Sequence, residues 1–94
     1  MNNNVFKLEP TTDAPAPPEP RPISVIAREI RKTWPKVNYA AEPYLDAMLT
    51  LNLITDRYLF EDAKTMVIYF LGNAQTWRGE DARRIKAELK ALYN

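Results

Sequence analysis

Two adjacent pairs of carboxylates are the residues best suited to acid–base chemistry in this 94-residue chain. One pair is Glu61 with Asp62, and the other is Glu80 with Asp81. Neighbouring residues on a helix point in different directions, so neither pair converges on a single proton or metal ion. We expect both pairs to be solvated charges near helix N-termini, where negative charge is favourable.

Other catalytic chemistry lacks its usual residues. The chain has no histidine and no cysteine, so it offers no imidazole base, no thiol nucleophile and no thiolate zinc site. Ser24 is predicted at the start of a helix, and Gly72 and Gly79 are too few for a glycine-rich phosphate loop. The sequence therefore predicts that the protein is not an enzyme and uses no cofactor and no metal.

A basic stripe on the C-terminal helix is a candidate nucleic-acid-binding surface. Its members share one helical face or lie just before it: Arg78, Arg83, Lys86 and Lys90. Beside Trp77, such a stripe could contact phosphates and stack on a base. However, Glu80, Asp81 and Glu88 dilute it, and the net charge is only +1. Nucleic-acid binding is therefore our alternative hypothesis, and an ordinary solvated helix face explains the same pattern.

The segment 73–79, between two predicted helices, is the candidate protein-binding site. It contains Trp77 and Arg78, and tryptophan and arginine are the residues that most often anchor interfaces. Asn73 and Trp34 are further candidates. A competing interpretation is that Trp77 closes a small core while Thr76 caps the last helix. We favour a non-catalytic protein-binding module, whose partner is an unidentified protein or a second copy of the chain.

Hydrophobic spacing predicts an all-α fold, a compact bundle of about four helices in residues 23–94. The first helix starts at Pro22 or Ser24 and stops before Pro35. The second begins between residues 38 and 42 and runs to about Asn52. A turn is expected at residues 53–58, where Thr55 and Asp56 are cap-type residues. The fourth begins at residue 76 or 79, with an apolar stripe that extends from Ala82 to Leu92.

The third predicted helix, residues 60–71, contains the most apolar run of the chain. Residues 66–71 are apolar on every side, so we expect this helix to be the buried centre of the domain. A buried strand is the alternative, but the spacing of Phe60, Ala63, Val67 and Phe70 favours a helix.

Residues 1–22 are predicted to be a disordered arm, because six of the eight prolines lie between residues 10 and 22. A linker is the simplest role. Two other roles stay open: a PxxP ligand for a proline-reading domain, or a strand at Val5, Phe6 and Leu8 added to a partner's sheet. No secretory signal is visible, and the longest apolar run is about a third of a membrane span. We therefore expect a cytoplasmic protein that does not bind membranes.

Three stretches carry a resemblance to known proteins: Pro22 to Ala27 (PISVIA), Ala40 to Met48, and Tyr69 to Leu89 with NAxTWRG and RRIKAEL. Over residues 22–90 the chain resembles small uncharacterised proteins encoded by bacteriophages, prophages and other bacterial mobile elements. The resemblance implies a bacterial cytoplasm and an accessory role that acts on host or phage proteins. It implies no functional motif.

Overall fold

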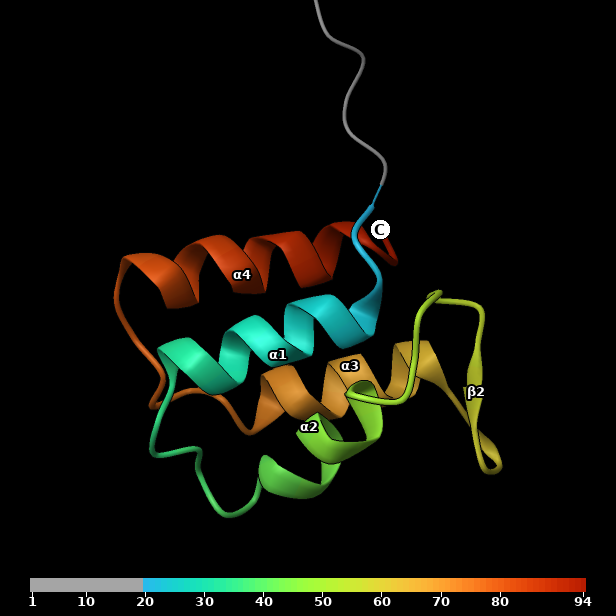
Figure 1. Cartoon of the computed structure of the whole chain (residues 1–94), viewed down its shortest axis with the longest axis horizontal. Coiled ribbons are helices and arrows are strands. Elements are labelled where there is room, and N and C mark those ends of the chain that lie inside the picture. The colour runs from blue at the N-terminus through green and yellow to red at the C-terminus, as the bar shows by residue number, and fades with distance from the viewer. Residues whose placement is uncertain (1–19) are drawn as a thin grey trace, which may run out of the picture.

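The computed structural model describes residues 20–94, which form four helices and one short hairpin (Figure 1). The elements in chain order are α1 (Ile23–Thr33), α2 (Glu42–Met48), β2 (Arg57–Tyr58), β3 (Glu61–Asp62), α3 (Ala63–Gly72) and α4 (Glu80–Ala91). The predicted compact, mostly helical domain is confirmed, and the structure adds a small two-stranded sheet in which β2 pairs with β3. Most of the proline-rich arm, including its PxxP spacings and the segment from Val5 to Leu8, lies outside the described residues.

Helix α1 lies between α4 on one side and α2 on the other (Figure 1). Its apolar residues recur at helical spacing and are fully buried: Ile23, Ile26, Ala27 and Ile30. The helix begins after Pro22, whose carbonyl accepts the N–H groups of Val25 and Ile26. It ends at Thr33 because Trp34 precedes a proline and leaves the helical region. Both predicted ends are confirmed.

Helix α2 ends at Met48, four residues before the predicted end at Asn52. The backbone turns at Thr50 and Leu51, and the carbonyls of Leu51 and Asn52 accept the N–H groups of Ser24 and Ile23 at 2.7 and 2.9 Å. These N–H groups belong to the first turn of α1 and have no partner within that helix. The loop after α2 thus supplies hydrogen-bond acceptors to the first turn of α1. Its backbone must depart from helical geometry to reach these N–H groups.

Helix α3 begins at Ala63, and the predicted start at Phe60 is wrong. Residues 57–62 form an antiparallel hairpin instead, in which Arg57 pairs with Asp62 and Tyr58 with Glu61. The Arg57 side chain holds the turn, because it donates to the Asp62 carboxylate and to the Phe60 carbonyl, both at 3.1 Å. The predicted turn at 53–58 is correct only up to Asp56, since the next two residues form β2.

The buried centre of the domain is not α3 alone. Met66, Val67 and Phe70 are buried against the core, whereas Ile68 and Tyr69 are exposed on the opposite side of the helix. Packing covers only one face of α3, so apolar composition on every side did not mean burial on every side. Among residues 20–94, no helix is long and apolar enough to cross a membrane.

Candidate functional site

Trp77, the proposed interface anchor, lies in the core and is only 4% exposed. Its ring stacks on that of Trp34, which is 8% exposed, with ring centroids 5.4 Å apart and planes 7° from parallel. Phe70 meets both indoles edge-on, at 6.1 Å from Trp34 and 6.4 Å from Trp77. The expectation that Trp77 and Trp34 are displayed is therefore corrected: both rings are buried against each other and against Phe70, as large aromatic side chains of a small core are.

The connection between α3 and α4, residues 73–79, is fastened by polar contacts to the rest of the domain. The Lys86 ammonium donates hydrogen bonds of 2.7 Å to the carbonyls of Ala74 and Trp77. The Asn73 side-chain amide donates to the Tyr69 backbone carbonyl at 2.9 Å. The backbone carbonyl of Asn73 accepts from the Asn38 side-chain amide at 3.1 Å. Asn73 and Lys86, both candidate site residues, thus hold the fold.

Gly79 and not Thr76 precedes the first turn of α4. Gly79 is the N-cap residue with φ +112°, a value that side-chain-bearing residues rarely adopt. Thr76 is exposed and its side chain caps no helix, so the predicted capping role is wrong. The glycine turn brings Arg78 beside the first turn of α4, where Arg78, Arg83 and Lys86 border one shallow hollow.

The basic face, defined here as Arg78, Arg83, Lys86 and Lys90, is brought together as the sequence predicted. Arg78, Arg83 and Lys90 are exposed, and Lys86 is half-buried. Burial lowers the pKa of Lys86, and the nearby charges of Lys90 and Arg78 lower it further. These like charges are therefore close enough to repel one another, which is the condition for a locally positive potential.

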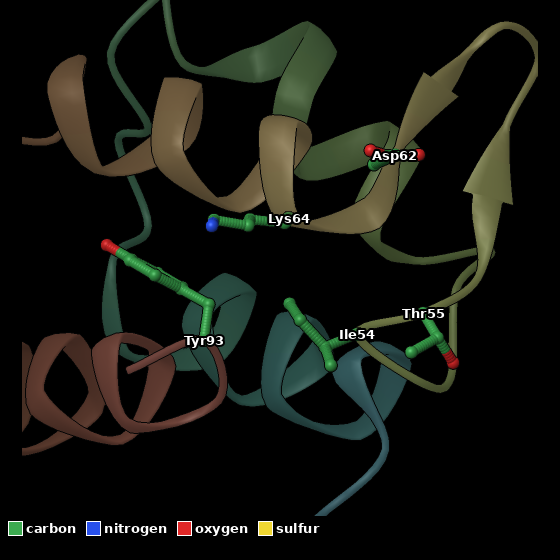
Figure 2. A pocket seen from close by; sticks show the side chains of 5 residues that line it. All are labelled: Ile54, Thr55, Asp62, Lys64 and Tyr93. Carbon is green, nitrogen blue, oxygen red and sulfur yellow. The ribbon is translucent and has the colours of Figure 1, made fainter.

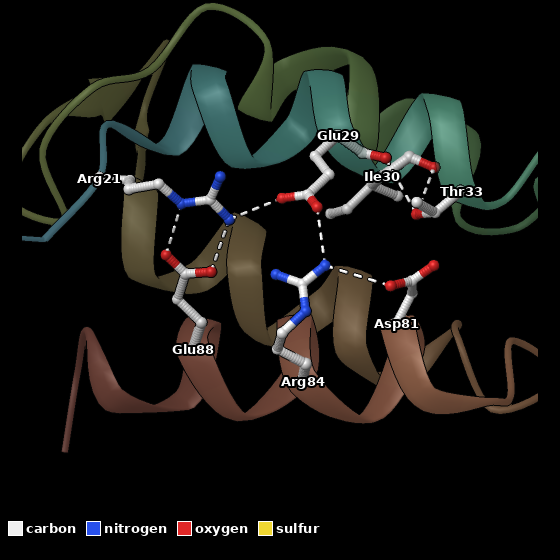
Figure 3. A network of polar contacts seen from close by, with 7 residues as sticks. All are labelled: Arg21, Glu29, Ile30, Thr33, Asp81, Arg84 and Glu88. Carbon is white, nitrogen blue, oxygen red and sulfur yellow. Dashed lines mark hydrogen bonds and ion pairs between the residues drawn. The ribbon is translucent and has the colours of Figure 1, made fainter.

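Two of the three carboxylates that dilute the basic stripe in sequence, Asp81 and Glu88, lie on the side of α4 that faces α1 (Figure 3). The Arg21 guanidinium donates to both carboxylate oxygens of Glu88, at 2.8 and 2.7 Å, and to one carboxylate oxygen of Glu29 at 2.8 Å. Arg84 contacts Glu29 at 2.7 Å and Asp81 at 3.2 Å. The Arg84 and Arg21 guanidinium groups lower the pKa of Glu29, in that order of importance.

Arg21 is a residue that sequence reasoning assigned to the disordered arm. Its hydrogen bonds to Glu88 and Glu29 join the start of the described chain to α4 and α1, and they raise the pKa of its guanidinium above its usual value. The folded domain therefore starts before residue 23. No local pattern around Arg21 could have revealed this, because Glu88 is 67 residues away.

Apolar exposure is concentrated where the sequence did not place a site. Leu59 and Phe60 form the two-residue hairpin tip and are 78% and 91% exposed. Leu59 has φ +57°, in the left-handed region that a leucine seldom adopts. Leu53, on the loop before the hairpin, is also exposed. The Asp56 carboxylate holds this loop, because it accepts hydrogen bonds from the backbone N–H groups of Asn52 and Leu53. These backbone N–H groups lower the pKa of Asp56.

A hollow of about 380 Å³ lies between the hairpin, the start of α3 and the C-terminal turn (Figure 2). It is lined by Ile54, Thr55, Asp62, Lys64 and Tyr93. The Lys64 ammonium lies 5.8 Å from the centroid of the Tyr93 ring, and Asp62 is bound to Arg57. The lining holds a single carboxylate, so it offers no pair of carboxylates. Within residues 20–94 no cluster of three potential metal ligands exists.

Comparison of the chain with protein-family models, with curated proteins and with solved structures finds no match. The resemblance to proteins of bacteriophages and other mobile elements stays a prediction.

Proposed function

We propose that the protein is a non-catalytic protein-binding module whose contact surface is the hairpin tip, Leu59 and Phe60. The observation that carries this proposal is the display of two large apolar side chains in sequence, with Leu59 in a left-handed backbone conformation. Exposed apolar surface and unfavourable backbone geometry both reduce stability, and both occur preferentially at functional positions.

The tip is built to present these side chains outward. Two residues on each strand pair, and the Arg57 guanidinium closes the turn from Phe60 to Asp62. In Figure 1 the hairpin projects beside the helices at one end of the domain. A projecting apolar tip fits a partner that offers an apolar pocket or groove, where burying Phe60 would supply a central anchor.

Capture from a bacterial lysate tests the proposal, and the resemblance to mobile-element proteins is the reason for that choice of lysate. The immobilised full chain should retain a partner that the variant Phe60→Ser loses. Tyr39→Ser is the matched control, because Tyr39 is an aromatic residue with the same 91% exposure, on the loop between α1 and α2. Equal retention by Phe60→Ser and the wild-type chain would disprove the role of the tip.

A second copy of the chain is the other partner to test. Sedimentation over a range of concentrations should show association of the wild-type chain and a monomer for Phe60→Ser, if copies meet through the tip. If the wild-type chain and Phe60→Ser are both monomers at every concentration, the partner is a different protein, which the lysate experiment would capture.

A further inference from the structure

The charges of α4 are segregated into two rows on opposite sides of its buried stripe. Asp81, Arg84 and Glu88 recur at helical spacing and face α1 (Figure 3). Arg83, Lys86 and Lys90 recur with the same spacing. At about 100° per residue the second row lies roughly half a turn from the first. Asp81 and Glu88 therefore do not lie among the cations of the basic face.

The carboxylates of this region are already bound by other arginines. Within residues 20–94, Asp81 is paired with Arg84 and Glu88 with Arg21, which leaves Glu80 as the one α4 carboxylate available to offset the basic face. Elsewhere Arg31 forms ion pairs with Glu42 and Asp46, and Arg57 forms an ion pair with Asp62. The net charge of +1 thus understates the potential at the basic face, because the balancing negative charge lies elsewhere.

The spacing of the cations suits a chain of phosphates. Arg83 and Lys90 are seven residues apart, which is about 10 Å along the helix axis, and Lys86 lies between them. Successive phosphates of one nucleic-acid strand advance about 3.4 Å along a duplex, so the row spans several of them. Arg78 and Arg83 add guanidinium groups, which bind phosphate oxygens in pairs.

A membrane surface fits this face less well. A helix that lies on a membrane needs large apolar side chains beside its cations, whereas the exposed neighbours on α4 are Ala87 and Ala91. The exposed leucine and phenylalanine of the hairpin tip lie at the other end of the domain from the start of α4 (Figure 1).

We infer that the basic face binds the phosphate backbone of nucleic acid, without reading its sequence. Arg78, Arg83 and Lys90 make the contacts. Lys86 adds its charge, but its ammonium is already committed to the carbonyls of Ala74 and Trp77. This surface is separate from the hairpin tip, so the domain could hold a protein and a nucleic acid together.

Fluorescence anisotropy of the full chain with labelled 20-nucleotide single strands and duplexes of mixed sequence, at 20–200 mM NaCl, tests the inference. Binding should weaken linearly on a plot of log affinity against log salt, with about one unit of slope for each cation engaged. Arg83→Gln with Lys90→Gln should lower the slope by about two units and the affinity at 50 mM salt at least tenfold.

The matched control is Arg28→Gln with Lys32→Gln, which removes the same charge from exposed residues of α1 that form no ion pair within residues 20–94. Equal losses of oligonucleotide affinity in both double variants would show attraction by net charge alone and would overturn the inference. Binding to anionic phosphatidylserine vesicles without binding to either oligonucleotide would also overturn it. Phe60→Ser should bind oligonucleotides like the wild-type chain, which separates this result from the proposed function. Circular dichroism melts near wild type confirm that each variant is folded.

Discussion

Trp34 and Trp77 stack face to face with their ring centroids 5.4 Å apart, although 43 positions separate them in the chain. The contact joins the end of α1 to the connection between α3 and α4, and Phe70 packs edge-on against both rings. The three aromatic residues therefore close one end of the core. Lys86 covers this cluster, with its ammonium 5.9 Å from the Trp77 ring centroid.

Trp77→Ala should destabilise the domain by about 3 to 5 kcal/mol, because it removes a buried indole and leaves a cavity against Trp34 and Phe70. Arg78→Ala, at the exposed next residue, should change the unfolding free energy by no more than about 0.5 kcal/mol. Urea unfolding of both variants measures the difference. A Trp77→Ala variant as stable as Arg78→Ala would show that the indole is not part of the core in solution.

The sequence predicts α1 well because all of its determinants are local. The spacing from Ile23 to Ile30 and the proline after Trp34 suffice to place both ends. The end of α2 is not determined locally, because the carbonyls of Leu51 and Asn52 accept from N–H groups that lie 27 and 29 residues away in the chain. The hairpin has no glycine, asparagine or aspartate in its two-residue turn, so the usual turn signal is absent.

The candidate sites were predictable to different degrees. Helical spacing was enough to group Arg83, Lys86 and Lys90. The removal of Glu88 from their neighbourhood depends on Arg21, a tertiary partner that periodicity cannot reveal. Residue type also failed to decide between an interface and a core for Trp77, since tryptophan is favoured in both.

Removing residues 1–19 should leave the melting temperature within a few degrees of the full chain, because every contact described above is made by residues 20–94. Arg21→Gln in the full chain should lower it more, since that change breaks the bidentate contact with Glu88 and the contact with Glu29. We expect a loss of about 1 to 2 kcal/mol, or several degrees for a domain of this size. If the truncated chain melts well below Arg21→Gln, the first 19 residues contribute to the fold.

Glu29 should make stability depend on pH in the acid range. Its pKa is lowered in the folded state by Arg84 and Arg21, so its contribution is present above the unfolded-state pKa of about 4.5 and is lost as the pH falls through the lower folded-state pKa. Glu29→Gln should therefore be less stable than wild type by about 1 kcal/mol at pH 7, and this difference should shrink as the pH falls below the unfolded-state pKa and through the folded-state pKa.

Chemical denaturation of Glu29→Gln and the wild-type chain between pH 2.5 and 7 measures this gap. Glu61→Gln is the control, because Glu61 is exposed and forms no ion pair within residues 20–94. A gap for Glu29→Gln that stays constant down to pH 2.5 would mean that the carboxylate charge is not what stabilises the contact between α1 and α4.

Substitutions at Leu59 should change stability in the order that the left-handed region imposes, even though the side chain touches little. Leu59→Asn should be as stable as the wild-type chain or more stable by up to about 1 kcal/mol, because asparagine tolerates φ near +57°. Leu59→Val should be less stable by about 1 kcal/mol, because a β-branched side chain is strained there.

Phe60→Asn and Phe60→Val form the control pair, since Phe60 is exposed at the same tip and is not among the residues with positive φ. Thermal melts of the four variants settle the order. If valine is tolerated at Leu59 as well as asparagine is, the hairpin relaxes in solution and the tip does not hold the two apolar side chains in the fixed arrangement on which the proposed contact surface depends.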